Sequence, residues 1–358
     1  MPKLCCTDCF EHKTVQDFIK ENGSGRGFCD FCEENKRHCI EPYYLADLFR
    51  PLVDLYERIE NFMPLEMMKE FEGQNIAEKL AEDWAPFSND LPDNVGRILS
   101  AMFPCYDHKE DDGIDLDGWV ENSDMFWGAE DEPSILLEKA WKEFCEEIIS
   151  ENRFFPKKQL DLDFLNGIPI LVQDLKEGKF LFRARKSSKK QKIAPRNMGK
   201  PPAYLSQPGR ANPKGIPYLY LATDNQTAIH EIRPQTTQFV TIGNFKITRE
   251  LKIFDLSNPR IYDPFLCGED LQHIITLLSF FRMLGHELSK PVDPKEKELH
   301  YIPTQYLCEF IKHQGYDGIS YKSHIGPGRN IALFDESKVK CTRSILYSID
   351  AKPIKINP

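Results

Sequence analysis

Hydrophobic residues recur at helical spacing in the part of the chain that spans residues 41–160. Leu45, Leu48, Leu52 and later apolar residues follow one another at three- and four-residue steps in the first helical stretch. A second stretch, residues 134–155, repeats this pattern, and Ser134 is its predicted N-cap. We therefore expect residues 41–160 to form a mainly helical domain.

A different pattern begins near residue 161, where short β-type runs alternate with helical ones. Strands are predicted at 179–185, 218–222 and 238–247, and helices at 269–288 and 302–315. Pro303 is expected to open the last helix and Gly315 to end it. The segment contains neither a Rossmann fingerprint nor a P-loop. We expect an α+β domain over residues 161–358.

The first 40 residues carry two CxxC pairs. The four cysteines are Cys6, Cys9, Cys29 and Cys32. Two such pairs at this separation supply four thiolates for a tetrahedral, structural zinc site with no open position for chemistry. Cys5 is an alternative to Cys6 as a ligand. The sequence predicts a small zinc module over residues 1–40.

Composition and charge argue against nucleic-acid binding, secretion and membrane insertion. The chain has 358 residues and a formal net charge of −10, which disfavours binding to nucleic acid. We find no secretory signal and no apolar run of membrane-spanning length. Eleven cysteines without a signal indicate a reducing compartment, and we expect a cytoplasmic protein without membrane contact.

Two charged stretches are open to more than one interpretation. The acidic run at 108–132 lacks the spacing of a calcium-binding EF-hand loop, and we interpret it as a solvated loop. The basic run at 183–192 is equally consistent with a lid over an anionic ligand and with a solvated loop.

Residues 182–233 contain several candidate site residues. Arg183 and Arg185 alternate on a predicted strand and point to one face, where an anionic partner is expected. Asp224 is a predicted N-cap. Glu231 falls about two turns later, and an alternative to a functional role is a salt bridge to Arg233.

Several motifs in this part of the chain resemble the RES domain, a family named for its Arg, Glu and Ser. They are FRAR at 182–185, GRANPKGIPYLYLA at 209–222, AIHEIRP at 228–234, YIPTQYLCEFIKHQGYDGISYKS at 301–323 and GRNIALF at 328–334. The resemblance covers most of residues 175–340. The preceding cysteine-rich and helical segments resemble, more weakly, the HEPN-like domain often fused to RES domains.

The resemblance implies a mixed-sheet fold similar to the ADP-ribosyltransferase toxins, and it assigns site residues by position. These are Arg183, Arg210, Tyr220, Glu231 and Ser323, with Ser320 as a rival for the family serine. Lys322 stands where the family pattern has proline, which is why the rival stays open. Glu231, Tyr220 and Arg183 are expected to be catalytic, and Arg183, Arg210, Tyr220 and Ser323 to bind NAD.

The function that the resemblance implies is a bacterial toxin that cleaves the nicotinamide–ribose bond of NAD, with inorganic phosphate or water as acceptor. A helix-turn-helix antitoxin is the implied partner, and a homo-oligomer is left open. Two alternatives remain at this level. One is an ADP-ribosyltransferase that modifies a macromolecule, and the other is a binding module whose RES domain is silent.

Overall fold

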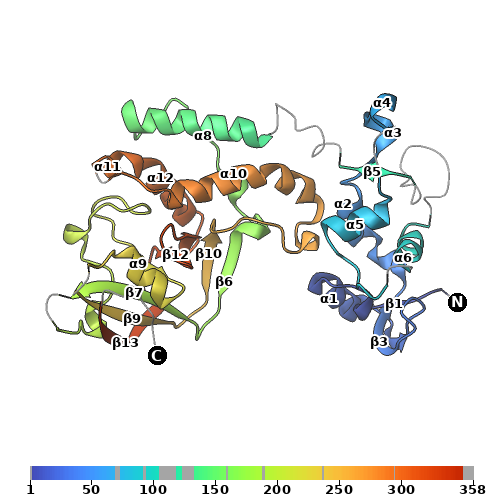
Figure 1. Cartoon of the computed structure of the whole chain (residues 1–358), viewed down its shortest axis with the longest axis horizontal. Coiled ribbons are helices and arrows are strands. Elements are labelled where there is room, and N and C mark those ends of the chain that lie inside the picture. Colours follow the sequence, from blue (N-terminus) through green and yellow to red (C-terminus); the bar gives the residue numbers. More distant parts are fainter. Residues whose placement is uncertain are drawn as a thin grey trace. The chain divides into compact units, whose positions relative to one another are not determined.

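The computed structural model describes residues 2–68, 73–91, 94–104, 118–122, 133–158, 160–187, 190–235, 238–293 and 295–349. The chain divides into two compact units (Figure 1). Unit 1 comprises Met1–Glu132 and Ile261–Thr276, and unit 2 comprises Pro133–Arg260 and Leu277–Pro358. These boundaries differ from the three segments expected from sequence, because part of the later chain packs with unit 1.

Unit 1 combines short helices with small sheets. Its strands are β1 (Cys5–Cys6), β2 (Gly25–Phe28), β3 (Asn35–Ile40), β4 (Glu57–Arg58) and β5 (Val120–Glu121). Its helices are α1 (Lys13–Asn22), α2 (Ala46–Val53), α3 (Ile59–Phe62), α4 (Leu65–Met68), α5 (Ile76–Asp83) and α6 (Val95–Met102). The helical stretch predicted after residue 41 is thus broken into short pieces, with β4 between two of them.

Aromatic packing explains why residues 261–276 belong to unit 1. The ring of Phe49 lies with its centroid 4.7 Å from that of Phe265 and 5.6 Å from that of Phe87. Thr14 also donates a hydrogen bond of 2.7 Å to Asp263. Buried aromatic pairs of this kind stabilise a core beyond their area alone.

Unit 2 is built on an eight-stranded mixed sheet in the order β13-β9-β7-β8-β12-β11-β10-β6. The strands are β6 (Val172–Leu175), β7 (Phe180–Ser187), β8 (Leu219–Ala222), β9 (Phe239–Ile247), β10 (Leu251–Asp255), β11 (Gly318–Lys322), β12 (Arg329–Leu333) and β13 (Val339–Ser348). Only β10 and β11 pair in parallel among these neighbours. The predicted strands are confirmed, and the α+β class with a mixed sheet is confirmed with them.

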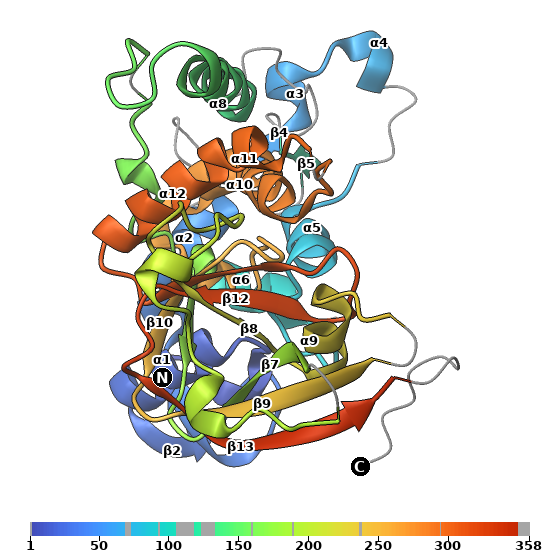
Figure 2. The same cartoon turned by 90° about the vertical axis from the view of Figure 1, so that its left-hand side faces the viewer.

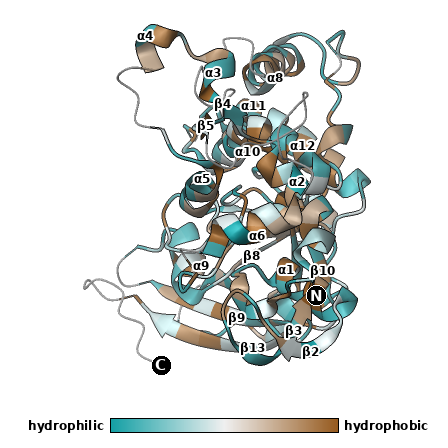
Figure 3. Ribbon diagram, turned by 90° about the vertical axis from the view of Figure 1, so that its right-hand side faces the viewer, coloured by the Kyte–Doolittle hydropathy of each residue, from teal (hydrophilic) through white to brown (hydrophobic). Residues whose placement is uncertain are grey.

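The helices of unit 2 are α8 (Pro133–Ser150), α9 (Asn225–Glu231), α11 (Lys297–His300), α12 (Ile302–His313) and most of α10 (Leu271–Ser289). The two predicted helices after residue 268 are confirmed, and Gly315 follows α12 with a φ of +87°. Helix α8 carries both hydrophobic and hydrophilic residues (Figure 3), and Phe144 on it packs 4.8 Å from Tyr306 of α12, between ring centroids. The predicted N-cap at Ser134 is wrong, because α8 begins at Pro133 and Ser134 lies inside it.

The two faces of the sheet carry separate hydrophobic clusters. Leu181, Met198, Leu221 and Ile331 belong to the larger cluster on one face. On the other face Ala184, Ala222 and Ile242 pack with Ala228 and Ile229 of α9, which lies beside the strands (Figure 2). Because side chains alternate along a strand, neighbouring residues of β7 and β8 point to opposite clusters.

The acidic run at 108–132 lies mostly outside the described residues, as do residues 188 and 189 of the basic run. No helix in the described parts of the chain is both long and apolar enough to span a membrane.

Candidate functional site

A cavity of about 270 Å³ lies on the face of the sheet that α9 covers. Strand β7 supplies Phe182 to its wall, β8 supplies Tyr220, β11 supplies Tyr321, β12 supplies Asn330 and α9 supplies Glu231. Strands β7 and β8 share a single register pair, Phe182 with Ala222. The cavity therefore lies where two neighbouring strands of the sheet are joined over a short length only.

Glu231 is the last residue of α9 and is exposed. Its Oε1 accepts a hydrogen bond of 2.7 Å from the Ser323 hydroxyl and one of 2.6 Å from Nδ2 of Asn330. The alternative of an ion pair with Arg233 is not observed among the described residues. The structure thus joins the expected glutamate on α9 to the expected serine after β11, and adds Asn330 of β12.

The local sequence explains why α9 places Glu231 there. Asp224 caps the helix by accepting 2.7 Å from the amide of Thr227, so the predicted N-cap is confirmed. The helix then runs two turns and ends at Glu231, where its unpaired carbonyls carry a partial negative charge. A carboxylate at this end adds to that negative potential, which favours a cationic ligand or transition state.

Ser323 lies just after β11 at the start of a glycine-containing turn. Its hydroxyl accepts 2.9 Å from the amide of Gly326 and 3.3 Å from that of Ile325. Gly328 closes the turn against α9, where its amide donates 2.8 Å to the Thr227 hydroxyl. A Cβ on Gly328 would clash with Asp224 Oδ2, so the close approach of this turn to α9 favours glycine.

Ser320, the rival for the family serine, points elsewhere. It pairs in register with Ile331, which belongs to the hydrophobic cluster on the opposite face, while Tyr321 pairs with Asn330 at the cavity. Ser320 is fully buried and its Oγ has no hydrogen-bond partner among the described residues. The structure therefore brings Ser323 to Glu231 and leaves Ser320 away from the cavity.

Arg183 forms part of the cavity wall, but its head group is bound elsewhere. Nη1 donates 2.7 Å to the carbonyl of Gly199 and 3.2 Å to that of Met198. Arg183 shares its strand face with Leu181 and Arg185, and Arg185 likewise donates to the carbonyl of Asn197. The structure thus confirms that the two arginines share a face but does not bring the Arg183 guanidinium to Glu231.

The positive charge of Arg183 is not neutralised by a nearby carboxylate among the described residues. Burial and the neighbouring Arg185 lower the pKa of Arg183 to about 10, while the charge of Glu336 opposes the shift. Among the described residues no carboxylate lies within 4 Å of its guanidinium. A partly buried cation in this state favours an anionic ligand.

Arg210 lies in the loop before β8. Its guanidinium carbon stands 5.4 Å from the ring centroid of Tyr301, a cation–π contact. Two α12 side chains hold the loop backbone: Thr304 donates 2.7 Å to the carbonyl of Arg210, and Gln305 donates 2.8 Å to that of Gly209. The positive charge of Arg210 reaches Tyr321 at the cavity, where it lowers the pKa of that tyrosine against a larger rise caused by burial.

Tyr220 joins this loop to the cavity. Its hydroxyl donates 2.7 Å to Oδ1 of Asn212 and accepts 3.1 Å from the amide of Ala211. Burial raises the pKa of Tyr220, because a phenolate would be poorly solvated at this place. Tyr218 is instead buried against Phe334, with ring centroids 4.9 Å apart, and belongs to the core.

Two cavity residues were not singled out from the sequence. Asn330 lies within the motif at 328–334 and Tyr321 within the motif at 301–323, but neither residue type signals a role by itself. Asn330 is 7% exposed and Tyr321 is 5% exposed. A polar residue near the start of an apolar strand that follows a glycine-rich turn is the signal that could have identified Asn330.

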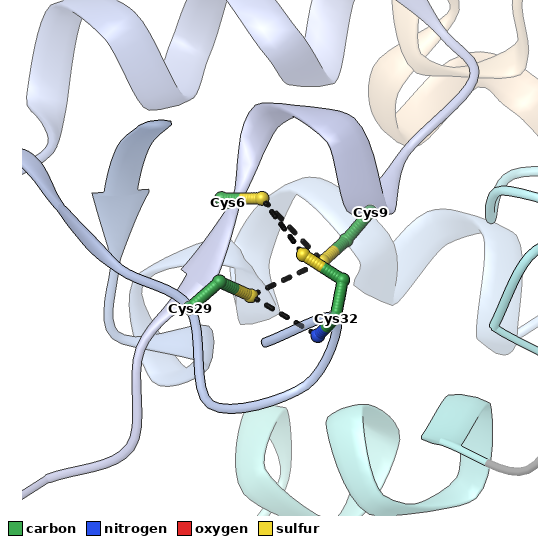
Figure 4. Close-up of side chains that lie close together, drawn as sticks. All are labelled: Cys6, Cys9, Cys29 and Cys32. Atoms are coloured by element: carbon green, nitrogen blue, oxygen red, sulfur yellow. Dashed lines mark hydrogen bonds between the residues drawn. The ribbon is translucent and has the colours of Figure 1, made fainter. Parts of the chain in front are cut away.

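A second candidate site lies in unit 1, where Cys6, Cys9, Cys29 and Cys32 converge (Figure 4). Their Sγ atoms all lie within 4.8 Å of one another, and Cys9 Sγ is 3.5 Å from Cys29 Sγ and 3.8 Å from Cys6 Sγ. Cys5 is not part of the cluster: it is buried, and its Sγ donates to the carbonyl of Ile40 at 3.5 Å. The four sulfurs form a candidate metal site, and the alternative ligand Cys5 is left out of it.

Residues 180–351 match the family model of the RES domain. This part of the chain is therefore a RES domain, which confirms the resemblance seen in its motifs. The match does not extend to the preceding segments, where the HEPN-like domain stays a prediction.

Comparison with solved structures returned the crystal structure of the M. tuberculosis MbcT–MbcA toxin–antitoxin complex. The match has 12% sequence identity, covers 53% of this chain and 94% of that chain, and has a TM-score of 0.32. A likeness this distant carries no argument about the function of the chain. A search of curated proteins gave no match.

Proposed function

We propose that the RES domain consumes NAD by cleaving its nicotinamide–ribose bond. The observation that carries this proposal is the Glu231 carboxylate, held by Ser323 and Asn330 at the wall of a cavity in a RES domain. Departure of neutral nicotinamide leaves positive charge on the ribose, as in glycoside cleavage. A fixed carboxylate is the group that stabilises such a charge as it develops.

The cavity walls suit the nicotinamide riboside end of the substrate. Phe182, Tyr220 and Tyr321 offer aromatic surface to a flat ring and its ribose. A volume of about 270 Å³ is close to the lower limit for small-ligand sites, and smaller than a whole dinucleotide needs. We therefore place the nicotinamide riboside in the cavity and the pyrophosphate outside it.

Positive charge for the pyrophosphate comes from Arg210 and Arg183 in this proposal. Among the described residues neither guanidinium has a carboxylate within 4 Å. For Arg183 to reach the substrate, its bonds to the carbonyls of Met198 and Gly199 must be exchanged for bonds to phosphate oxygens, in which both partners are charged. The acceptor in the second half of the reaction is water or inorganic phosphate.

The decisive experiment is NAD turnover by the purified full-length protein, with and without inorganic phosphate, followed by mass spectrometry. Nicotinamide release that requires phosphate and yields ADP-ribose-1″-phosphate identifies a phosphorylase, whereas release without phosphate identifies a glycohydrolase. Transfer of ADP-ribose to a macromolecule would instead support a transferase.

The matched variants are Glu231→Gln and Glu177→Gln. Loss of the Glu231 charge is expected to lower kcat at least about 100-fold, the scale for removing one electrostatic group from an active site. Glu177 is an exposed glutamate outside the cavity, and its variant is expected to keep full activity. Full activity of Glu231→Gln would refute the assignment of the site.

By family resemblance we further propose that this activity makes the protein a toxin held in check by an antitoxin, for which a helix-turn-helix protein is the proposed class. Induced expression of the wild type should deplete cellular NAD and stop growth, and Glu231→Gln should do neither. Growth arrest by Glu231→Gln at equal expression would separate toxicity from NAD cleavage.

For the cysteine cluster we propose structural zinc. A tetrahedral zinc with Zn–S bonds of about 2.3 Å places its sulfurs about 3.8 Å apart. The observed Sγ separations of 3.5 and 3.8 Å match this spacing, and four thiolates are the ligand set of a closed site. Zinc would stabilise the two segments of unit 1 that carry the CxxC pairs, and it would take no part in the chemistry at Glu231.

A further inference from the structure

The two carboxylate oxygens of Glu231 are in different situations. Oε1 accepts both the Ser323 and the Asn330 hydrogen bonds, at 2.7 and 2.6 Å. Among the described residues no donor reaches Oε2. Since Glu231 is exposed and lines the cavity, Oε2 is the oxygen left for a ligand.

The Ser323 hydroxyl has no capacity left for a ligand while it binds Glu231. A hydroxyl has one proton to donate and two lone pairs to accept with. The proton goes to Glu231, and the lone pairs take the amides of Ile325 and Gly326. Ser323 is also buried, with 3% exposed. It acts on Glu231 and through Glu231 on any ligand.

Asn330 reaches the same oxygen from a rigid part of the sheet. It lies on β12, pairs in register with Ala222 on one side and Tyr321 on the other, and is 7% exposed. A side chain held between two paired strands keeps its orientation better than one on a loop. The serine at the turn and the asparagine on the strand thus fix Oε1 from two independent supports.

We infer that Ser323 and Asn330 are positioning residues, which hold Oε1 of Glu231 so that Oε2 faces the ribose of NAD. This inference rests on the proposed function and assigns the serine a role different from direct substrate contact. It also adds Asn330 to the site. The carboxylate would accept a ribose hydroxyl through Oε2 and lie close to the anomeric carbon as positive charge develops there.

Loss of either hydrogen bond to Oε1 is expected to reduce kcat and leave KM for NAD nearly unchanged. Ser323→Ala and Asn330→Ala should each lower kcat on the order of 10- to 100-fold, the range for a hydrogen bond to a charged group. The double variant should lose much less than the product of the two, because a carboxylate freed by one change has little more to lose from the second.

Asn330→Asp gives a readout that a merely structural residue would not. Two carboxylates at this distance cannot both be charged, so one must take up a proton. The protonated carboxyl of the new side chain could then donate to Glu231 as the amide does, and relative activity should rise as pH falls from about 8 to about 5. The charged and titratable groups that line the cavity with Glu231 are Arg183 on β7, Tyr220 on β8 and Tyr321 on β11, and His230 precedes Glu231 on α9. They are the same in both proteins, so the ratio to wild type isolates the new pair.

The chain offers matched controls. Ser320→Ala removes a buried hydroxyl without a described partner from the same strand, on the face away from the cavity. Asn258→Ala removes an exposed amide outside the cavity. Both should keep kcat within about 2-fold, the range of typical surface or neutral changes.

The test combines steady-state kinetics of these full-length proteins with crystal structures of Ser323→Ala and Asn330→Ala. Lower kcat with constant KM, non-additivity and a displaced Glu231 carboxylate support the inference. If the wild type cleaves NAD and both Ser323→Ala and Asn330→Ala keep full kcat, the inference is overturned and the proposed function is left intact. If the wild type does not cleave NAD, the proposed function fails, and a Glu231 carboxylate unmoved in both crystal structures overturns the inference as well.

Discussion

The phenolic oxygen of Tyr220 lies 2.7 Å from Oδ1 of Asn212 and joins strand β8 to the loop that carries Arg210. The same oxygen accepts the amide of Ala211 at 3.1 Å. A Cβ on Gly209 would stand 2.5 Å from it, so glycine is required for the loop to close around the tyrosine. Tyr220 therefore contributes to the cavity with its ring and to the loop with its hydroxyl.

Replacing Tyr220 by phenylalanine separates these two contributions. Tyr220→Phe keeps the ring but leaves Asn212 Oδ1 and the Ala211 amide without their partner. We expect the free energy of unfolding to fall by about 1–2 kcal/mol. KM for NAD should rise roughly 3- to 10-fold because the Arg210 loop loosens. Chemical denaturation and steady-state kinetics measure both.

The control for that variant is Tyr204→Phe, since Tyr204 is 85% exposed. It should change neither stability nor KM. A large loss of kcat in Tyr220→Phe with unchanged KM would contradict the positioning role of the hydroxyl and place it in the chemistry.

Arg183 should matter for substrate binding more than for stability. Its pKa is lowered from 12.5 to about 10, so the folded state binds its proton less tightly than the unfolded state. The resulting cost to stability is complete below pH 10 and fades as pH rises from 10 to 12.5. At neutral pH, Arg183→Gln removes that cost together with two bonds to carbonyls, so we expect a small change in Tm.

In the same variant KM for NAD should rise at least about 10-fold, because a charge-assisted fork to phosphate is lost. Arg185→Gln is the matched control: it lies on the same strand face, is exposed and also donates to a carbonyl. Equal KM values for the two variants would show that position 183 has no special role in binding.

Gly328→Ala should damage the turn that places Ser323. The added Cβ would clash with Asp224 Oδ2 and come within 2.6 Å of Thr223 Oγ1, both at the start of α9. We expect Tm to fall by several degrees and kcat to fall with it, since the cap of α9 and the turn must both move. Thermal unfolding and NAD turnover report the two effects.

Gly96→Ala provides the comparison. Gly96 lies in helix α6, and a Cβ added to it would meet nothing within 4 Å. Alanine in a helix should hold or raise Tm. If Gly328→Ala were as stable and active as Gly96→Ala, close packing of the turn on α9 would not be what fixes Ser323.

Metal content distinguishes the cysteines of unit 1. Cys32→Ser should reduce bound zinc from one per chain to a small fraction and lower Tm, because one of four thiolates is lost. Cys5→Ser should keep its zinc, since Cys5 bonds to a carbonyl and lies outside the cluster. Elemental analysis of the purified proteins gives the ratio. Zinc loss on changing Cys5 rather than Cys32 would reassign the ligand set.

Several features of this site could be predicted from the sequence because they depend on local physical rules. The alternation of Phe182 and Arg183 predicts opposite faces of a strand, and the position of Asp224 predicts a helix cap. The motifs that pointed to Glu231 also predicted a serine of the site, for which Ser323 and Ser320 were the two candidates. Helical periodicity failed in residues 41–63, where tertiary packing breaks the stretch into α2, β4 and α3.

The choice between the two serines needed the tertiary structure. Ser320 and Ser323 differ by three positions, an odd number, so they belong to opposite faces of β11 and its extension. Which face holds the cavity depends on where α9 packs, and the spacing of the serines carries no information on that. The position of the Arg183 guanidinium likewise depends on the carbonyls of Met198 and Gly199, which only the folded chain brings close to it.

By itself, the sequence determined the α+β class of the C-terminal part, the paired cysteines and the RES motifs, because periodicity and spacing follow from the geometry of single elements. Only the tertiary structure decided that Glu231 meets Asn330, 99 residues away, and that two donors share one of its oxygens. Contacts of this kind follow from the register of β8, β12 and β11 and from the packing of α9 on them, and these are properties of the assembled sheet.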